Sequence, residues 1–344
     1  MNKEKITVAI NGFGRIGRAF FKLSWDNPQI DVVAINDLGD VNMLAYLLKY
    51  DTVYGNWGHE VSIDGHDLIV DGKKIKIVSE KDPTQLPWGS MNIDVVVEST
   101  GFFTTYDKAN AHIVAGAKKV VISAPGKPGE DTSIMGETIL LGVNEEKFGT
   151  CDVTSNASCT TNASSPLIAI LHSAFGIEKA ILNTVHGYTA SQSLVDGPSK
   201  KDFREGRAAA QNIVPSSTGA AIAVTKAFPE LSGLFDGIST RVPVPAGSIV
   251  DITFISKTHV TAEQVNEALI KASQDPKWSK IFAVTNEPLV SSDILGRTHA
   301  SIADLQMTRV VDGNLVKVMA WYDNEMGYTA TLVDHVIKTG NTIK

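Results

Sequence analysis

Two side chains in the middle of the chain could carry covalent chemistry. Cys159 stands in a polar stretch, SNASCTTNASSP, immediately before an apolar run that predicts a helix. Unpaired N–H groups and the macrodipole at a helix N-terminus stabilise a thiolate, so we expect this cysteine to have a lowered pKa. His186, near the end of a predicted strand in NTVHGYT, is the candidate base, although His172 and His299 compete for that role. A thiol beside an imidazole predicts nucleophilic catalysis.

The only other cysteine, Cys151, is expected to behave as a small buried hydrophobic residue. Two cysteines in 344 residues do not make a disulfide framework, so at least one thiol is expected to be free. No spacing of His, Cys, Asp and Glu residues suggests a metal site.

The N-terminal segment KITVAINGFGRIGRAFFKLSW predicts a strand, a tight turn and a helix. The turn holds Gly12, Gly14 and Gly17 in the pattern G-x-G-x-x-G, in which backbone N–H groups can approach a pyrophosphate closely. The pattern alone fits a simple packing turn equally well. Asp37, at the end of the next strand and 37 − 17 = 20 residues past the last glycine, favours a dinucleotide because its carboxylate can accept from the adenosine ribose. It also favours NAD over NADP, since it would repel a 2′-phosphate.

The elements around these residues predict two domains. Further strands at 93–100, 118–125 and 138–144 alternate with helical patterns, which indicates an α/β fold with a Rossmann-type doubly wound parallel sheet. After Cys159 the pattern becomes that of an α+β catalytic domain with a mixed, largely antiparallel sheet. We expect an NAD-binding domain at 1–158, completed by a C-terminal helix at 324–344, and a catalytic domain at 159–323. The aperiodic segment 188–211 predicts a functional loop or an interface.

Composition narrows the possible partners and the location. A chain of 344 residues exceeds what one core usually supports. The formal charge of −7 offers no basic face, so nucleic acid is not expected as a primary partner. No apolar run of about 18–20 residues predicts a membrane span. We expect a cytoplasmic protein.

Five sequence stretches occur in this order along the chain: INGFGRIGR, SNASCTTN, PSSTGAA, RVPVP and WYDNEMGY. Together they resemble phosphorylating glyceraldehyde-3-phosphate dehydrogenase over nearly the whole chain. The resemblance implies an NAD-dependent oxidative phosphorylation of D-glyceraldehyde 3-phosphate to 1,3-bisphosphoglycerate through a cysteine thiohemiacetal and thioester, in glycolysis or gluconeogenesis. It also implies a homotetramer.

The same resemblance implies roles for individual residues. Cys159 would be the nucleophile and His186 its activator. The implied substrate residues are Thr189 and Arg241 for the substrate phosphate, Ser158, Thr218 and Gly219 for inorganic phosphate, and Thr160 at the border of the site. The implied cofactor residues, besides Gly12, Gly14, Gly17 and Asp37, are Arg15 and Ile16 at the pyrophosphate, Lys81 near the adenine, Ser123 near the nicotinamide and Asn324 at its carboxamide.

The sequence departs from the family pattern at a few positions. Ala163 stands where a second cysteine is common, and Met326 and residues 246–248 (AGS) are unusual. Three other functions compete with the main interpretation. They are a dehydrogenase of erythrose 4-phosphate, a non-enzymatic NAD-binding interaction protein, and a cysteine hydrolase, which would leave the glycine turn and Asp37 without a purpose.

Overall fold

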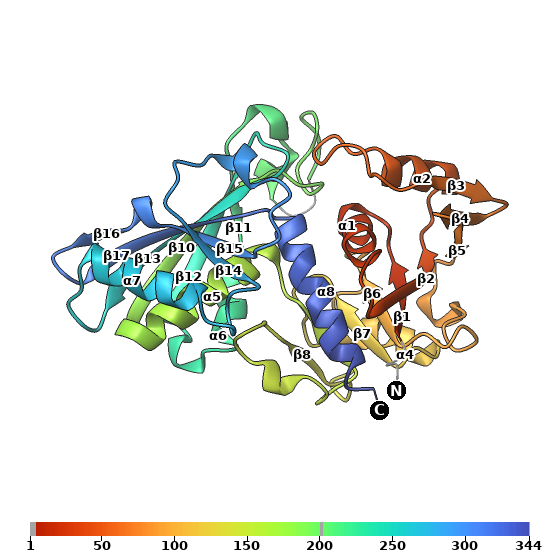
Figure 1. Ribbon diagram of the computed structural model, residues 1–344, viewed down its shortest axis with the longest axis horizontal. Coiled ribbons are helices and arrows are strands. Elements are labelled where there is room, and N and C mark those ends of the chain that lie inside the picture. Colours follow the sequence, from red (N-terminus) through yellow and green to blue (C-terminus); the bar gives the residue numbers. More distant parts are fainter. Residues whose placement is uncertain (1–4, 200–201, 344) are drawn as a thin grey trace. The chain divides into compact units, whose positions relative to one another are not determined.

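The computed structural model of the protein describes residues 5–199 and 202–343. The chain forms two compact units, which Figure 1 traces along the sequence. The first comprises the chain up to Ile139, Glu145–Ala157 and the segment from Thr329 onward. The second comprises Leu140–Asn144 and Ser158–Tyr328. The assignment of cofactor binding to 1–158 with 324–344, and of catalysis to 159–323, stays a prediction.

The first unit contains a nine-stranded sheet in the order β3-β4-β5-β2-β1-β6-β7-β9-β8. Neighbours from β5 to β8 in this order run parallel, while β3, β4 and β5 pair antiparallel as small hairpins. The strands are β1 (Ile6–Asn11), β2 (Ile30–Asn36), β3 (Val61–Asp64), β4 (Asp67–Val70), β5 (Lys73–Val78), β6 (Val95–Glu98), β7 (Lys119–Ile122), β8 (Gly136–Thr138) and β9 (Val153–Ser155). The strand expected over 138–144 is wrong beyond Thr138, because the chain turns there with Gly142 at φ +73°.

Different helices cover the two faces of this sheet (Figure 1). One face packs against α3 (Tyr106–Ala109) and α4 (Ala111–Val114), with Ala9, Val96, Val120 and Val153 in the shared core. Thr154 points to the other face, where its hydroxyl lies 2.8 Å from Nε2 of His335 on α8 (Met326–Gly340). The remaining helices of this unit are α1 (Arg15–Ser24), α2 (Val41–Lys49) and the 3-10 turns η1 (Pro83–Gln85) and η2 (Glu145–Lys147). The predicted doubly wound α/β sheet is confirmed.

The second unit contains an eight-stranded mixed sheet in the order β11-β12-β10-β13-β17-β15-β14, with β16 paired to β17. Only β10–β12 and β14–β15 are parallel pairs, so the prediction of a largely antiparallel sheet is confirmed. The strands are β10 (Ile177–Gly187), β11 (Val214–Ser217), β12 (Phe235–Val242), β13 (Ser248–Ser256), β14 (Phe282–Thr285), β15 (Ser301–Asp304), β16 (Arg309–Val311) and β17 (Leu315–Tyr322).

The helices of the second unit pack on one face of its sheet. They are α5 (Cys159–Phe175), α6 (Ala220–Thr225) and α7 (Ala262–Ser273), joined by the 3-10 turns η3 (Phe203–Gly206), η4 (Ala209–Gln211), η5 (Pro229–Leu231), η6 (Ser291–Ile294) and η7 (Leu305–Met307). Alternation along the strands buries Leu182 and Ile252 beneath these helices. Ile181 and Ile238 point the other way and are 60% and 55% exposed. This outer face of the sheet therefore exposes apolar side chains.

Candidate active site

Cys159 is the first residue of α5. Ser158 before it has an extended backbone and caps the helix, since its hydroxyl oxygen accepts from the N–H of Thr161 at 3.1 Å. The following residues are buried up to Ile168, which anchors the helix on the sheet. The cap and the buried body of the helix together fix the thiol at the helix N-terminus.

The strand β10 brings His186 to this thiol. Sγ of Cys159 lies 3.3 Å from Nε2 of His186, which is 3% exposed. The two residues are 27 positions apart in sequence, and the turn between α5 and β10 closes that distance. A thiol and an imidazole in contact can exchange a proton.

Arg241 lies on the other side of the imidazole, because β12 runs parallel to β10 and pairs Arg241 with His186. Nδ1 of His186 is 2.6 Å from Nη1 of Arg241 and also 2.6 Å from the carbonyl oxygen of Gly187. If Nδ1 carries the proton, it donates to Gly187 and leaves Nε2 as a base. If it does not, it accepts from Arg241 and the proton resides on Nε2. The partner that holds Nδ1 therefore decides whether Nε2 can take the thiol proton.

Burial decides the resting protonation states of this pair. Desolvation raises the pKa of the Cys159 thiol, and Arg241 and the N–H of Thr160 act in the opposite direction. Desolvation, followed by the charge of Arg241, lowers the pKa of His186 to about 3. The lowered thiol pKa that we expected is therefore wrong, because the partial charge of a helix end is outweighed by the loss of water. The pair rests as a thiol and a neutral imidazole.

The first unit holds a cavity of about 590 Å³ at the carboxyl ends of β1, β2 and β6. The predicted residues Gly12, Gly14, Asp37 and Lys81 are among those that line it. Gly12 has φ +92°, and a Cβ there would lie 2.7 Å from the backbone nitrogen of Thr100. Apart from Gly14 and its chain neighbours, no atom of the described residues lies within 4 Å of a Cβ built on Gly14, which leaves room for a ligand beside the turn.

The other predicted cofactor residues of this unit lie outside the lining. Arg15, Ile16 and Gly17 form the first turn of α1, next to Gly14. A Cβ on Gly17 would lie 2.1 Å from the carbonyl oxygen of Gly12, so this glycine lets the helix pack on the turn. Ser123 follows the last residue of β7, and its N–H belongs to the backbone ladder with Glu98.

Asn324 lies in the second unit and has a fixed amide orientation. Its Oδ1 accepts from the N–H of Gly247 at 3.1 Å and from the hydroxyl of Ser248 at 3.0 Å. Ser248 in turn accepts from the N–H of Gly187, the residue after His186. The unusual segment 246–248 thus holds the amide oxygen, so Nδ2 remains as the donor of this side chain.

Comparison with known proteins accounts for both units. Residues 6–106 match the family model of the glyceraldehyde 3-phosphate dehydrogenase NAD binding domain, and residues 158–324 match that of the C-terminal domain. The chain is 49% identical to glyceraldehyde-3-phosphate dehydrogenase 1 of Bacillus subtilis and to glyceraldehyde-3-phosphate dehydrogenase of Geobacillus stearothermophilus, over 96% of this chain and 96% of each relative. It is 47% identical to glyceraldehyde-3-phosphate dehydrogenase 2 of Streptomyces avermitilis, over 98% of this chain and 99% of that protein.

The chain belongs to the glyceraldehyde-3-phosphate dehydrogenase family. Membership confirms the resemblance that the five sequence stretches carry, and with it the enzyme class and the cofactor NAD. The NAD binding domain of the glyceraldehyde-3-phosphate dehydrogenase family covers the glycine turn, Asp37 and Lys81.

Among the described residues, three with implied anion-binding roles form their hydrogen bonds away from the Cys159–His186 pair. Thr189 follows β10, and its N–H donates to Oε1 of Gln192 at 2.9 Å. Thr218 and Gly219 precede α6, and the hydroxyl of Thr218 accepts from the N–H of Ala220. All three lie in the second unit with Arg241.

Tyr322 is a residue of this site that sequence reasoning missed. Its buried hydroxyl lies 2.9 Å from Oγ1 of Thr160 and 2.8 Å from Oγ1 of Thr184, and its ring packs edge-on against His186. The hydroxyl ties the first turn of α5 to β10, and so fixes the thiol relative to the imidazole. A tyrosine at an inward position of a strand, where its hydroxyl must find a partner, is the signal that could have revealed it.

Three further findings concern the described residues. Among residues 5–199 and 202–343, no group of three His, Cys, Asp or Glu side chains is placed to hold a metal ion. No helix in these ranges is long and apolar enough to span a membrane. A larger hollow of about 860 Å³, beside α5 and α7, contains none of the predicted site residues.

Proposed function

We propose that the protein oxidises D-glyceraldehyde 3-phosphate with NAD and inorganic phosphate to 1,3-bisphosphoglycerate, in glycolysis or gluconeogenesis. The observation that supports it most directly is the 3.3 Å contact between the Cys159 thiol and the His186 imidazole at the start of α5. In this proposal Cys159 and His186 are the catalytic residues.

The first step forms a bond between sulfur and the aldehyde carbon. His186 Nε2 takes the thiol proton as the sulfur attacks, and it returns this proton to the new alkoxide. The product is a thiohemiacetal. Because the pKa of His186 is about 3, the imidazole is unprotonated at neutral pH, and Nε2 has a free lone pair when Nδ1 donates to Gly187.

In the second step the thiohemiacetal hydroxyl gives its proton to Nε2 while hydride leaves the same carbon, which produces a thioester. NAD supplies the hydride acceptor when bound. In the third step a phosphate oxygen attacks the thioester, the carbon–sulfur bond breaks, and the departing sulfur takes the proton from the imidazolium. The acyl phosphate keeps the free energy of the oxidation.

We propose the following roles toward NAD for the predicted cofactor residues. Gly12 and Gly14, with the first-turn backbone of Arg15, Ile16 and Gly17, fit the pyrophosphate because they leave space beside a helix N-terminus. Asp37 would accept from the ribose, Lys81 would contact the adenine region, and Ser123 and Asn324 would contact the nicotinamide. The donor Nδ2 of Asn324 suits a carboxamide oxygen.

We assign the substrate phosphate to Arg241 and Thr189, and inorganic phosphate to Ser158, Thr218 and Gly219, with Thr160 at the border. Nε of Arg241 is buried and has no hydrogen-bond partner among the described residues, as expected of a group that awaits an anion. An anion that draws the guanidinium away from Nδ1 of His186 would also favour the tautomer in which Nε2 is the base. Substrate binding would thus prepare the base.

The deciding experiment is NADH formation from glyceraldehyde 3-phosphate with and without inorganic phosphate. We expect turnover that depends on phosphate and a higher kcat/KM with NAD than with NADP. Hydrolysis to the free acid at an equal rate without phosphate would contradict the proposal. A higher kcat/KM for erythrose 4-phosphate would favour the alternative dehydrogenase, and binding of NAD without turnover would favour the interaction protein.

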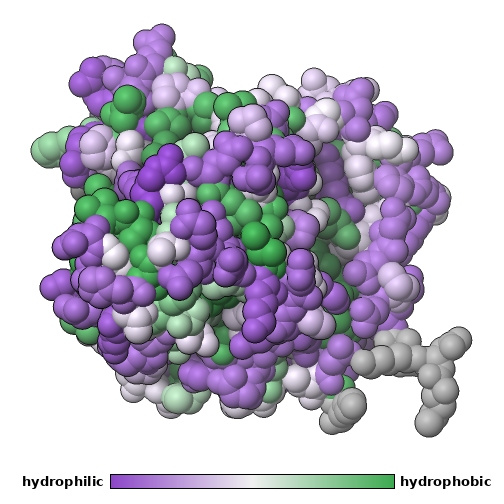
Figure 2. Space-filling model, turned by 60° about the vertical axis from the view of Figure 1, so that its left-hand side comes forward, coloured by the Kyte–Doolittle hydropathy of each residue, from purple (hydrophilic) through white to green (hydrophobic). Residues whose placement is uncertain are grey.

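We also propose a homotetramer in the cytoplasm, where a reducing environment keeps the thiol of Cys159 available. Figure 2 shows hydrophobic residues reaching the surface in several patches. Apolar side chains are strongly exposed on the outer face of the second sheet and in segment 188–211: Ile181, Ile238, Leu194, Val195 and Phe203. Patches of this kind mark protein interfaces. Light scattering at micromolar concentration should give four times the chain mass, and a monomer would contradict it.

A further inference from the structure

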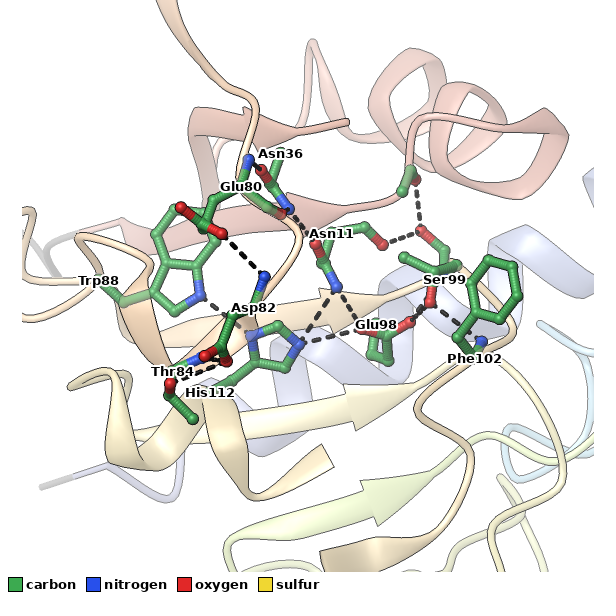
Figure 3. A network of polar contacts seen from close by, with 12 residues as sticks. Asn11, Asn36, Glu80, Asp82, Thr84, Trp88, Glu98, Ser99, Phe102 and His112 are labelled. Atoms are coloured by element: carbon green, nitrogen blue, oxygen red, sulfur yellow. Dashed lines mark hydrogen bonds and ion pairs between the residues drawn. The ribbon is translucent and has the colours of Figure 1, made fainter. Parts of the chain in front are cut away.

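A buried polar network lies at the base of the cavity in the first unit (Figure 3). Its innermost members, Trp88, Glu98 and His112, are at most 1% exposed. Glu98 ends β6, and it is the immediate neighbour of Asn11, which ends β1. Asn11 and Thr100 both line the cavity. The network therefore connects the protein interior to the residues that would face the cofactor.

Glu98 is surrounded by donors on both carboxylate oxygens. Oε1 accepts from the N–H of Thr100 at 2.8 Å and from its hydroxyl at 2.5 Å. Oε2 accepts from Nδ2 of Asn11 at 2.5 Å and lies 3.0 Å from Nε2 of His112. The N–H of Thr100 and Nδ2 of Asn11 can only donate, and the hydroxyl of Thr100 is able to donate, so this set of partners matches two oxygens that accept.

Trp88 fixes the tautomer of His112. The indole N–H, which can only donate, points at Nδ1 of the imidazole at 3.1 Å. Nδ1 therefore carries no proton, and the neutral ring has its proton on Nε2, where it is donated to Glu98. The 3.4 Å contact between Nδ2 of Asn11 and Nε2 of His112 brings together two donors that share one carboxylate oxygen.

The network continues from Glu98 along the rim of the cavity. Oδ1 of Asn11 accepts from Nδ2 of Asn36 at 2.7 Å, and Asn36 bonds both backbone groups of Glu80, the residue before Lys81. On the other side, the hydroxyl of Ser99 donates to the carbonyl of Gly12 at 2.7 Å. Glu98 thus lies at the junction between the glycine turn, the end of β2 and the Lys81 segment.

We propose that Glu98, which accepts from His112 in the tautomer that Trp88 fixes, is the positioning residue that sets the affinity of the first unit for the adenosine diphosphate part of NAD. The proposal rests on the proposed function in taking this cavity as the NAD site. Glu98 itself does not touch the ligand. It acts through Thr100 and Asn11, which do line the cavity.

The first test is Glu98→Gln, which keeps the shape but turns an amide N–H₂ toward groups that also donate. His112 cannot relieve this conflict by moving its proton, because Trp88 occupies Nδ1. We expect the Kd values for NAD and for ADP-ribose, measured by calorimetry, to rise together by at least about tenfold, since bonds to a charged acceptor are lost. The matched control is Glu146→Gln, on an exposed glutamate of the same unit, which should leave both values unchanged.

Two readouts separate this role from general damage to the fold. At saturating NAD, the KM for glyceraldehyde 3-phosphate and kcat should stay near those of the unchanged protein. The rate of Cys159 alkylation without NAD should also stay the same, because Cys159 belongs to the second unit. Equal Kd values for Glu98→Gln and the unchanged protein would overturn the proposal. Failure of the unchanged protein to bind either ligand would instead overturn the proposed function.

The sharper test is to combine Glu98→Gln with Trp88→Phe. Without the indole donor, His112 can carry its proton on Nδ1 and accept the new amide N–H at Nε2. We expect this double variant to bind NAD and ADP-ribose several-fold more tightly than Glu98→Gln alone. If Trp88 had only a structural role, the double variant should bind both ligands more weakly than Glu98→Gln alone, and that result would overturn the proposal. If Glu98→Gln does not fold, His112→Ala is the substitute variant. It removes one donor to Glu98 and should raise the Kd values for both ligands at least about threefold. Unchanged Kd values would contradict the proposal.

Discussion

At the scale of single residues, the contact partners of the two cysteines predict different reactivities. Cys159 contacts an imidazole that can take its proton, whereas Sγ of Cys151 donates to the carbonyl oxygen of Val153 at 3.2 Å. Burial raises the pKa of both thiols. At neutral pH we expect iodoacetamide to modify Cys159 first and to abolish NADH formation in step, as peptide mapping would show. Labelling of Cys151 first, or full activity after labelling of Cys159, would contradict the mechanism.

The same base can be tested by His186→Asn. We expect this change to slow alkylation of Cys159 and hydride transfer alike, because the group that takes the thiol proton is lost. General base catalysis typically raises the rate by about 10²- to 10⁴-fold, so we expect kcat to decrease by a factor in that range. Cys159→Ser is the companion variant: it should still bind NAD and turn over negligibly. A kcat within threefold of the unchanged protein for His186→Asn would argue against its role as base.

Arg241 allows a prediction about substrate choice. Loss of one charge-assisted contact to the substrate phosphate costs about 1.5–3 kcal/mol, so Arg241→Ala should lower kcat/KM for glyceraldehyde 3-phosphate by about 10- to 100-fold. Glyceraldehyde without the phosphate is the matched control, and its kcat/KM should change little. An equal loss for both aldehydes would mean that Arg241 acts on His186 alone.

At the scale of elements, two helices with similar caps separate stability from activity. The hydroxyl of Ser158 caps α5, and that of Thr261 caps α7 in a capping box with Gln264. We expect Ser158→Ala and Thr261→Ala each to lower the free energy of unfolding by about 1 kcal/mol in urea titrations. Only Ser158→Ala should reduce turnover, since α5 alone carries the thiol. Equal activity of the two variants would mean that Ser158 has no role in the proposed site.

The elements also show which contacts sequence reasoning can find. The glycine turn, Asp37 and the polar start of α5 were predictable because each is a local pattern with a physical reason. Asn11 and Glu98 meet across 87 residues, and Thr160 and Tyr322 across 162. No periodicity specifies such pairs, because strand order decides them. The fold class could be predicted from the alternation of strands and helices along the sequence. The end of β8 could not, because the chain turns near Gly142 within an apolar run.

At the scale of the whole molecule, two buried histidines make stability depend on pH. Burial lowers the pKa of His186 and of His335 to about 3. The unfolded chain binds a proton at each below about pH 6.5, and the folded chain does not until about pH 3. The free energy of unfolding should therefore decrease as the pH is lowered through this window, by about 2 kcal/mol per histidine between pH 7 and pH 5.

Urea unfolding of His335→Gln checks this dependence. His335 lies far from the proposed chemistry in sequence and bonds Thr154 and Asn156 of the first unit. The variant should lose stability at pH 7, because its fit to these partners is poorer, but its stability should drop by about 2 kcal/mol less between pH 7 and 5 than that of the unchanged protein. An equal drop in both proteins would show that His335 takes no part.

The position of α8 has a consequence for synthesis on the ribosome. The sheet of the first unit is complete in sequence at Ser155, yet the helix that packs on β9 through His335 is made last. At about 5–20 residues per second, the intervening chain takes on the order of ten seconds or more to emerge. During that interval the second unit can fold while the part of the first sheet at β9 that α8 covers is still bare. Nascent chains stalled before residue 329 should therefore recruit chaperones or aggregate, and release of the last helix should end that vulnerability.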